Sequence, residues 1–230
     1  NDFILILSED FPGMGAKKSL IQQLCNRNTG IGADGLFIIL SSEKYDFFLD
    51  YYNADGSWET LCANGSRCAS KFIYDLNKIT RKLKFETGAG IHTAEINSNG
   101  EVLMSMKPPI YKSGPIYPEG VSGFFVDSGA RHFVCQSDNL NESHVLTLGQ
   151  KIRRSKLFMP QGINVNFYRI EPDKSISIST YEKGVEQLMS SCSSGSMAVV
   201  YHLSKSLGLM SPITTHSIGG SLRFTFDDSW

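Results

Sequence analysis

The stretch Cys62-Ala63-Asn64-Gly65-Ser66 returns in altered form as Cys192-Ser193-Ser194-Gly195-Ser196. Each copy is a cysteine, two small or polar residues, a glycine and a serine. Each is followed by a run in which apolar residues recur three and four positions apart, which is the spacing of a helix that buries one face. Each cysteine is therefore expected to lie just ahead of a helix N-terminus, and the chain is expected to consist of two related halves.

A cysteine at a helix N-terminus lies in an electrostatic environment that suits an anion. The first N–H groups of a helix have no acceptor within it, and together with the helix dipole they favour negative charge. A thiol there loses its proton more easily than a free cysteine, whose pKa is about 8.5, and the same N–H groups can hold a carboxylate. Two such thiols on opposite sides of one carbon can invert it, because one removes a proton and the other returns it on the far face.

Burial is the competing interpretation, because free cysteine is among the most buried residue types. Taken singly, Cys62 or Cys192 is better explained as a core residue. The matched context of the pair favours the acid–base interpretation. Cys25, Cys68 and Cys135 have no such context and are expected in the core.

Composition narrows the class of protein. The chain has 230 residues, of which 41% are hydrophobic and 20% charged, and its formal net charge is −1. That balance is typical of a globular protein and gives no reason to expect nucleic acid or a membrane as a partner. No apolar run approaches the roughly 18 residues of a membrane span, and a secretory signal is not expected. An odd number of cysteines, five, favours reduced thiols in a cytoplasmic protein over a disulfide framework.

The pattern along the chain predicts an α+β protein, in which each half runs through strands, a cysteine-led helix and further strands. The predicted strands, read from continuous or alternating apolar runs, lie at 3–7, 36–40, 47–52, 83–87, 91–96, 102–106, 123–127, 132–135, 163–168, 175–181 and 222–226. Two further helices are predicted at 19–26 and near 146–153. The proline-rich residues 108–120 are the expected linker.

Short blocks in a fixed order resemble the diaminopimelate epimerase family, which belongs to a superfamily of cofactor-independent racemases with two cysteines. Any one block is short, but together they run along most of the chain. The blocks are NDF at 1–3, GIGADG at 30–35, NADGS at 53–57, CANG at 62–65, RC at 67–68, ETGAG at 86–90, TAE at 93–95, GARH at 129–132, NVNF at 164–167, YEKGVE at 181–186 and GGSL at 219–222.

The resemblance implies two pseudo-symmetric domains, 1–112 and 113–230, each a curled mixed sheet around a central helix, with the active site in the cleft. It implies that Cys62 and Cys192 are the acid–base pair of an epimerase that interconverts LL- and meso-diaminopimelate in lysine biosynthesis. His132 and Glu182 would be the dyad partners that set the protonation of the cysteines.

The resemblance also assigns residues to the substrate. The starts of the two helices would hold its α-carboxylate, through Ala63, Asn64, Gly65, Ser193 and Ser194. The distal part of the substrate would be bound by Asn1, Asn53, Asn164 and Lys183, with Glu182 also placed for an ammonium group.

Neither a cofactor nor a metal is expected. The α-proton of an amino acid is a weak acid, so the developing carbanion needs electrostatic stabilisation. Two helix N-termini aimed at the carboxylate would supply it without pyridoxal phosphate or a metal ion, and the scattered histidines have no metal-ligand spacing. The expected partner is a small amino-acid substrate, and a homodimer is left open.

Two alternatives stay open. Lys183, in place of the family's arginine, and the altered stretch Leu188-Met189-Ser190 leave room for a related racemase with another substrate. A catalytically silent relative that binds a ligand or a partner is the alternative from another class. Asn53 and Asn164 could equally be plain turn and strand-end residues.

Overall fold

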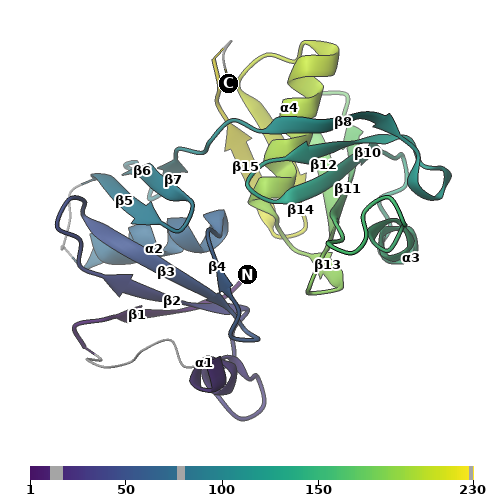
Figure 1. Cartoon of the computed structure of the whole chain (residues 1–230). Helices are drawn as coiled ribbons and strands as arrows, with labels where there is room; N and C mark the ends of the chain where they lie inside the picture. The colour runs from purple at the N-terminus through teal and green to yellow at the C-terminus, as the bar shows by residue number, and fades with distance from the viewer. Residues whose placement is uncertain (11–17, 77–80, 228–229) are drawn as a thin grey trace. The chain divides into compact units, whose positions relative to one another are not determined.

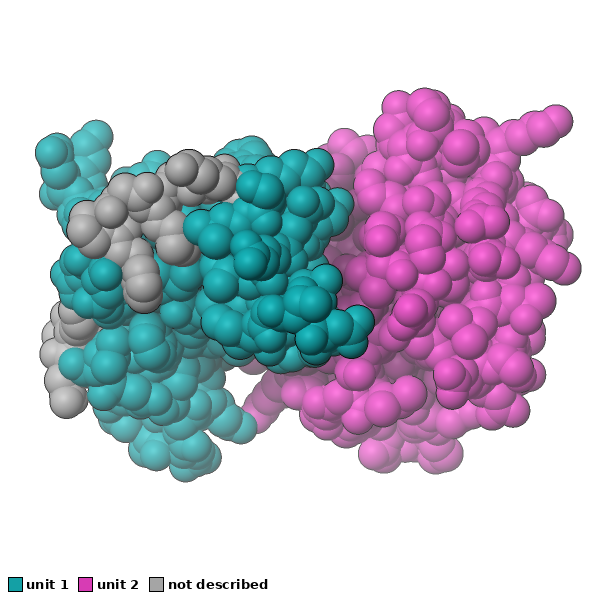
Figure 2. Space-filling view, turned by 90° about the horizontal axis from the view of Figure 1, so that it is seen from below, with its two compact units in different colours: residues 1–106 teal, residues 107–230 magenta. Residues whose placement is uncertain are grey.

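The computed structural model describes residues 1–10, 18–76, 81–227 and 230, and the chain divides into two compact units, Asn1–Met106 and Lys107–Trp230 (Figures 1 and 2). Each unit is a mixed sheet with helices packed on it, so the expected α+β class is confirmed. The boundary between the units follows Met106, which is earlier in the sequence than the predicted boundary after residue 112. The reason is that β8 (Ile110–Ile116) pairs with β9 (Gly123–Asp127) in the second sheet. The linker predicted at 108–120 is therefore wrong over most of its length.

The first unit holds a sheet in the order β1-β2-β3-β5-β6-β7, with β4 paired to β3. Its strands are β1 (Phe3–Leu7), β2 (Gly35–Leu40), β3 (Phe47–Asn53), β4 (Trp58–Glu59), β5 (Lys82–Thr87), β6 (Gly90–Ile96) and β7 (Val102–Met104). Its helices are α1 (Lys18–Cys25) and α2 (Ala63–Asp75). The strands and helices predicted for this half are confirmed, apart from the two-residue β4, which was missed.

The second unit holds a sheet in the order β15-β14-β12-β11-β10-β9-β8, with β13 paired to β12. Besides β8 and β9 its strands are β10 (Arg131–Gln136), β11 (Asn164–Ile170), β12 (Ile176–Glu182), β13 (Gln187–Met189), β14 (Ile213–Ser217) and β15 (Gly220–Phe224). Its helices are η1 (Pro118–Gly120), α3 (Glu142–Arg153) and α4 (Ser193–Leu207). Strands β13 and β14 were not predicted from the sequence.

The two units repeat one topology. The order β1-α1-β2-β3-β4-α2-β5-β6 in the first returns as β10-α3-β11-β12-β13-α4-β14-β15 in the second. Strand directions match as well. The β1–β2 and β3–β5 pairs are parallel, and so are β10–β11 and β12–β14. The β2–β3 and β5–β6 pairs are antiparallel, as are β11–β12 and β14–β15. The predicted pseudo-symmetry is confirmed.

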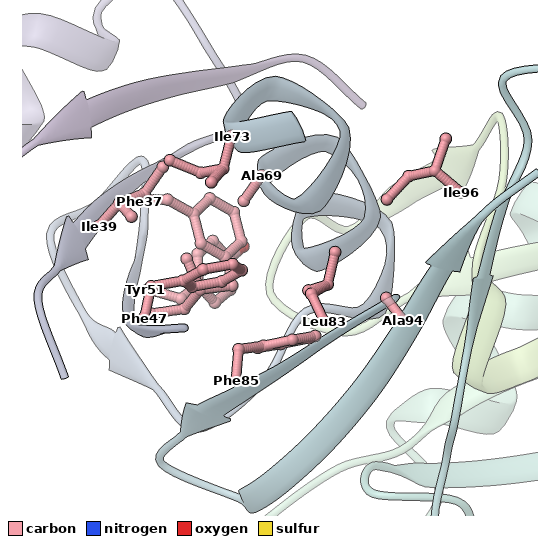
Figure 3. Close-up of a cluster of buried hydrophobic side chains, with 11 residues drawn as sticks. Phe37, Ile39, Phe47, Tyr51, Ala69, Ile73, Leu83, Phe85, Ala94 and Ile96 are labelled. Carbon is pink, nitrogen blue, oxygen red and sulfur yellow. The ribbon is translucent and has the colours of Figure 1, made fainter. Parts of the chain in front are cut away.

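In the first unit the cysteine-led helix packs on the inward face of a curled sheet. Ala69 and Ile73 of α2 contact apolar side chains from strands β2, β3, β5 and β6, including Phe37 and Tyr51 (Figure 3). Intervening residues of β1, β2 and β3 face the other way, where Ile21 of α1 packs. Both faces of β1 and β2 are thus covered, which explains their continuous apolar sequences, whereas β5 and β6 alternate buried and more exposed residues.

The second unit is built in the same way. Ala198, Val199 and Leu203 of α4 contact residues from β9, β10, β11, β12 and β14. On the opposite face, Val145 and Ile152 of α3 cover Phe133 and its neighbours. In the part of the chain that the structure describes, no helix has both the length and the apolar composition to cross a bilayer.

Candidate active site

Cys62 and Cys192 are the N-cap residues of α2 and α4. Their backbones are extended, with φ and ψ of −128° and 109° at Cys62 and −129° and 102° at Cys192. The carbonyl of each accepts a hydrogen bond at 2.9 Å, from the Ser66 N–H and the Ser196 N–H respectively. The predicted placement of each cysteine ahead of a helix N-terminus is confirmed, and the two backbone geometries are nearly identical.

In each unit the predicted site residues gather at one end of the sheet. In the first unit β1 and β2 begin and β3 ends where α2 begins, because Phe3 pairs with Gly35 and Gly35 pairs with Asn53. In the second unit β10 and β11 begin and β12 ends where α4 begins. The duplicated topology therefore delivers the ends of three strands to each cysteine-led helix.

Asn1 and Asn64 are brought together in the first unit. The Asn64 side-chain amide donates to Asn1 Oδ1 at 2.8 Å, and Arg67 Nη2 donates to Asn64 Oδ1 at 2.9 Å. Arg67 is half-buried. Burial lowers the pKa of Arg67, and the neighbouring Cys68 and Cys62 act in the opposite direction, which places the guanidinium in the electrostatic environment of Cys62.

Asn1 is held in turn by a cluster of charges that sequence reasoning missed. Its amide donates to Asp34 Oδ2 at 2.8 Å. Arg27 bonds Asp34 at 2.8 Å and grips both carboxylate oxygens of Asp2, at 3.0 and 2.7 Å. The Arg27 guanidinium holds the pKa of the Asp2 carboxyl below its usual value. The block GIGADG thus contributes Asp34 to the placement of Asn1.

Asn53 and Asn164 both bond to nearby residues at strand ends. Asn53 Oδ1 accepts from the Tyr51 hydroxyl at 2.7 Å, and its amide donates to Ser57 Oγ at 3.0 Å. Asn164 donates to the Arg131 carbonyl at 3.1 Å and accepts from the Lys183 N–H at 2.8 Å. Each amide therefore fixes a turn, and Asn164 fixes the backbone of Lys183.

The turn that carries Glu182 and Lys183 is closed by Glu186. Its carboxylate accepts from Arg153 Nε, from the Tyr181 hydroxyl at 3.1 Å and from the Gly184 N–H at 3.2 Å. The Glu182 carbonyl accepts from the Glu186 N–H at 2.8 Å. Glu182 is partly buried at the end of β12, whereas Lys183 is exposed.

His132 reaches Cys192 through an intermediate hydroxyl. His132 Nε2 lies 3.0 Å from Ser194 Oγ, and Ser194 Oγ lies 3.6 Å from Cys192 Sγ. His132 is fully buried, and burial lowers the pKa of its imidazole to about 3. A neutral imidazole thus stands two hydrogen bonds from the sulfur.

Beneath His132 lie two polar residues that were missed from the sequence, Asn166 and Thr180. The Asn166 amide lies 3.0 Å from His132 Nδ1, and the Thr180 hydroxyl donates to Asn166 Oδ1 at 3.0 Å. One signal pointed to Asn166, since asparagine is disfavoured within a strand whose neighbours are apolar. A further missed contact is Ser128, whose hydroxyl donates to the Ser194 carbonyl at 2.7 Å and anchors the first turn of α4.

The three remaining cysteines differ in burial. Cys25 and Cys135 are buried, as expected, and burial raises the pKa of both thiols. Cys68 is exposed, so its predicted place in the core is wrong; the neighbouring Ala69 occupies the buried face of α2 instead. Among the residues that the structure describes, no group of three or more histidine, cysteine, aspartate or glutamate side chains is placed to hold a metal ion.

Comparison of sequences gives consistent results along the chain. A family model described as diaminopimelate epimerase matches residues 1–112. A diaminopimelate epimerase from Flavobacterium psychrophilum is 38% identical over 231 residues, covering 99% of this chain and 87% of that protein. One from Aquifex aeolicus is 36% identical over 211 residues, covering 86% of this chain and 76% of that protein.

Comparison of structures identifies the fold. A probable proline racemase from Agrobacterium radiobacter K84 superposes with a TM-score of 0.68 at 18% identity, covering 89% of this chain and 70% of that one. A hydroxyproline epimerase from Agrobacterium vitis gives 0.67 at 16% identity, with 87% and 69% covered. A Bacillus anthracis phenazine biosynthesis protein of the PhzF family gives 0.66 at 15% identity, with 93% and 82% covered. These similarities confirm the expected fold.

Proposed function

Because the chain belongs to the diaminopimelate epimerase family, we propose that it interconverts LL- and meso-diaminopimelate in lysine biosynthesis. The structural observation that carries the proposal is the equivalence of Cys62 and Cys192. Both are N-caps of the central helix in two copies of one topology, with φ values one degree apart. Two thiols in matched positions suit a reaction whose forward and reverse directions are chemically alike.

The chemistry requires that both thiols act on one α-carbon. A thiolate at one cysteine takes the α-proton and becomes a thiol, leaving an electron pair on the carbon next to the carboxylate. The thiol of the other cysteine gives its proton to the opposite face and becomes a thiolate. One C–H bond breaks and one forms, so the configuration changes with no net gain of protons or electrons.

The carbanion formed between these steps needs stabilisation at the carboxylate. In this proposal the first-turn backbone N–H groups of α2, from Ala63, Asn64 and Gly65, and of α4, from Ser193 and Ser194, receive the carboxylate oxygens. The dipole of each helix also favours negative charge at its N-terminus.

The distal end of the substrate carries its own ammonium and carboxylate. We assign its recognition to Asn1, Asn53, Asn164, Glu182 and Lys183. Hydrogen bonds already fix several of these groups, including Asn1 to Asn64 at 2.8 Å and the Lys183 backbone to Asn164 at 2.8 Å. Fixing such groups before binding lowers the entropy that the complex must lose.

Hydrogen exchange in deuterated solvent tests the proposal. With LL-diaminopimelate as substrate, the wild-type protein is expected to form meso product that carries deuterium at the inverted carbon, seen by NMR and mass spectrometry. Cys62→Ser and Cys192→Ser are each expected to lose epimerisation. Cys68→Ser is the matched control, since this exposed cysteine lies on the same helix as the first site.

The outcomes separate the alternatives. Full activity in either active-site variant would contradict the two-thiol assignment. A panel of diaminopimelate, glutamate, histidine and lysine tests the substrate, and turnover of another amino acid in preference to diaminopimelate would identify a related racemase. Absence of α-deuterium exchange with every substrate would identify a binding protein instead.

A further inference from the structure

A chain of buried polar side chains runs through the second unit to Cys192. Asn166 and Thr180 are directly opposed on β11 and β12, and His132 lies diagonally across on β10. All three are almost wholly buried on the face of the sheet that α4 covers. Buried polar groups are costly unless every one is hydrogen-bonded. The donor and the acceptor of each bond can therefore be deduced from the partners that surround it.

The Asn166 amide is oriented by a partner other than His132. Its nitrogen lies 3.3 Å from the carbonyl oxygen of Phe133, and a carbonyl can only accept. Its oxygen accepts from the Thr180 hydroxyl at 3.0 Å. With nitrogen on one side and oxygen on the other, the amide presents an N–H to His132 Nδ1, 3.0 Å away.

This orientation fixes the tautomer of His132. Nδ1 accepts from Asn166 and carries no proton, and the buried ring is neutral, so the proton lies on Nε2. Nε2 therefore donates to Ser194 Oγ at 3.0 Å. Having accepted that bond, the Ser194 hydroxyl has its own proton to donate, and Cys192 Sγ lies 3.6 Å away.

The first unit shows that the fold does not require these buried polar side chains. By strand register, the positions of His132, Asn166 and Thr180 correspond to Phe3, Phe37 and Tyr51. Those three are aromatic, with Phe37 stacked on Tyr51 at 4.5 Å between ring centroids and Phe3 edge-on to Phe37 at 5.3 Å. The same place in the duplicated topology is thus apolar beside Cys62 and polar beside Cys192.

We propose that Thr180, Asn166, His132 and Ser194 form a relay of fixed direction, in which each member donates a hydrogen bond to the next and the Ser194 hydroxyl donates to Cys192 Sγ. The inference rests on the proposed function for its role in turnover, but the relay itself is a property of the free protein. Asn166 and Thr180 are positioning residues that act through His132 and Ser194. The relay favours the thiolate of Cys192 without adding a charge, so the two thiols are chemically unequal.

The first test measures the reactivity of Cys192 without substrate. Rates of alkylation by iodoacetamide are followed against pH, and peptide mass spectrometry separates Cys192 from Cys62, which serves as an internal reference. Ser194→Ala is expected to move the Cys192 profile to higher pH by about 0.5 to 1 unit, the effect of one hydrogen bond to the thiolate. Ser194→Thr keeps the hydroxyl and is expected to restore the profile. An unchanged profile in Ser194→Ala would overturn the proposal.

The second test asks whether the upstream residues act through Ser194. Asn166→Leu is expected to move the Cys192 profile in the same direction, and to have no further effect in the Ser194→Ala background. Thr180→Val is the milder variant in case Asn166→Leu does not fold, and Thr180→Ser is its conservative control. Additive shifts, or equal shifts at Cys62, would show general loosening of the fold and contradict the relay.

A third measurement reads the tautomer in the wild-type protein and uses a variant only to assign the signals. In protein labelled with ¹⁵N-histidine, the ring signals lost in His132→Gln belong to His132. Their shifts are expected to show a protonated Nε2 and an unprotonated Nδ1 throughout the neutral pH range. The opposite tautomer, or a doubly protonated ring at neutral pH, would refute the assigned direction. If the relay is confirmed and no substrate is epimerised, the proposed function fails while this inference stands.

Discussion

Asn166 lies directly beneath Gly195, so close that a Cβ atom on the glycine would be 2.2 Å from Asn166 Oδ1. The first unit repeats the arrangement with different chemistry, since a Cβ atom on Gly65 would lie 2.1 Å from the ring of Phe37. The glycine three positions after each of Cys62 and Cys192 is therefore required by the side chain that lies under the start of the helix. An amide occupies that place in one unit and an aromatic ring in the other.

Substitution of these glycines is expected to be costly. In Gly195→Ala or Gly65→Ala the new methyl group must displace a buried side chain or shift the helix start, and overpacking of this kind costs about 1–3 kcal/mol. Urea denaturation measures the loss, which should be accompanied by reduced epimerase activity. Gly114→Ala is the control, because a Cβ atom at Gly114 meets nothing within 4 Å. Equal stability of all three variants would contradict the packing argument.

Cysteine reactivity is expected to follow burial outside the two candidate catalytic positions. Cys135 is only 1% exposed, and burial raises the pKa of its thiol, so it should resist iodoacetamide in the native protein at pH 8. Exposed Cys68 should be labelled rapidly. Peptide mass spectrometry before and after denaturation distinguishes them, and labelling of native Cys135 at the rate of Cys68 would count against its position in the core.

Because buried histidines resist protonation in the folded protein, we expect the free energy of unfolding to decrease in acid. Burial lowers the pKa of His202 from 6.5 to about 4 in the folded protein, where Tyr111 bonds its Nδ1 at 2.9 Å. Between these values the unfolded chain binds a proton that the folded chain does not. The free energy of unfolding should therefore fall as pH drops from 6.5 towards 4, by about 1.4 kcal/mol per pH unit for each such histidine.

Urea midpoints measured across this range check the prediction. His202→Leu removes one of the groups and should flatten the dependence on pH, while the exposed His216→Gln controls for the loss of a histidine. A profile in His202→Leu as steep as in the wild-type protein would show that His202 takes up its proton equally in both states.

The turn at 182–186 offers a test of substrate positioning. Glu186→Ala removes the acceptor shared by Arg153, Tyr181 and the Gly184 N–H, so Glu182 and Lys183 should become less well placed. We expect KM for diaminopimelate to rise about tenfold, equivalent to roughly 1.4 kcal/mol of binding, with a smaller change in kcat. Glu171→Ala is matched to it, because Glu171 accepts from Arg169 and Ser177 at the opposite end of the same strands. A like rise in KM for Glu171→Ala would point to general loosening of the sheet.

Much of the fold could be predicted from local sequence because its signals are local. The cysteine-led helices follow from small N-terminal residues and apolar spacing, and the strand at Phe3–Leu7 follows from its continuous apolar run. Strand β8 was hidden by Pro115 within it and by the prolines at 108, 109 and 118 beside it. It lies at the edge of its sheet, so it pairs with another strand on one side only. A proline, which lacks an N–H group, is tolerated in such a strand.

The site was only partly predictable because its contacts join distant segments. The resemblance to a family assigned His132 a role, but the bond from His132 to Ser194 spans 62 positions and the one from Asn166 to His132 spans 34. No local pattern reports such pairs. Cys68 was misplaced for a different reason, since its neighbour Ala69 determines which side of α2 faces the sheet.

Joining both copies of the duplicated topology in one polypeptide has a genetic consequence. In an assembly of two identical half-length chains, every amino-acid change would arrive twice, once beside each sulfur. Within a single gene the codons for Phe37 and Asn166 mutate independently. Selection can then refine the surroundings of one sulfur atom while leaving those of the other untouched, so the two copies are free to specialise.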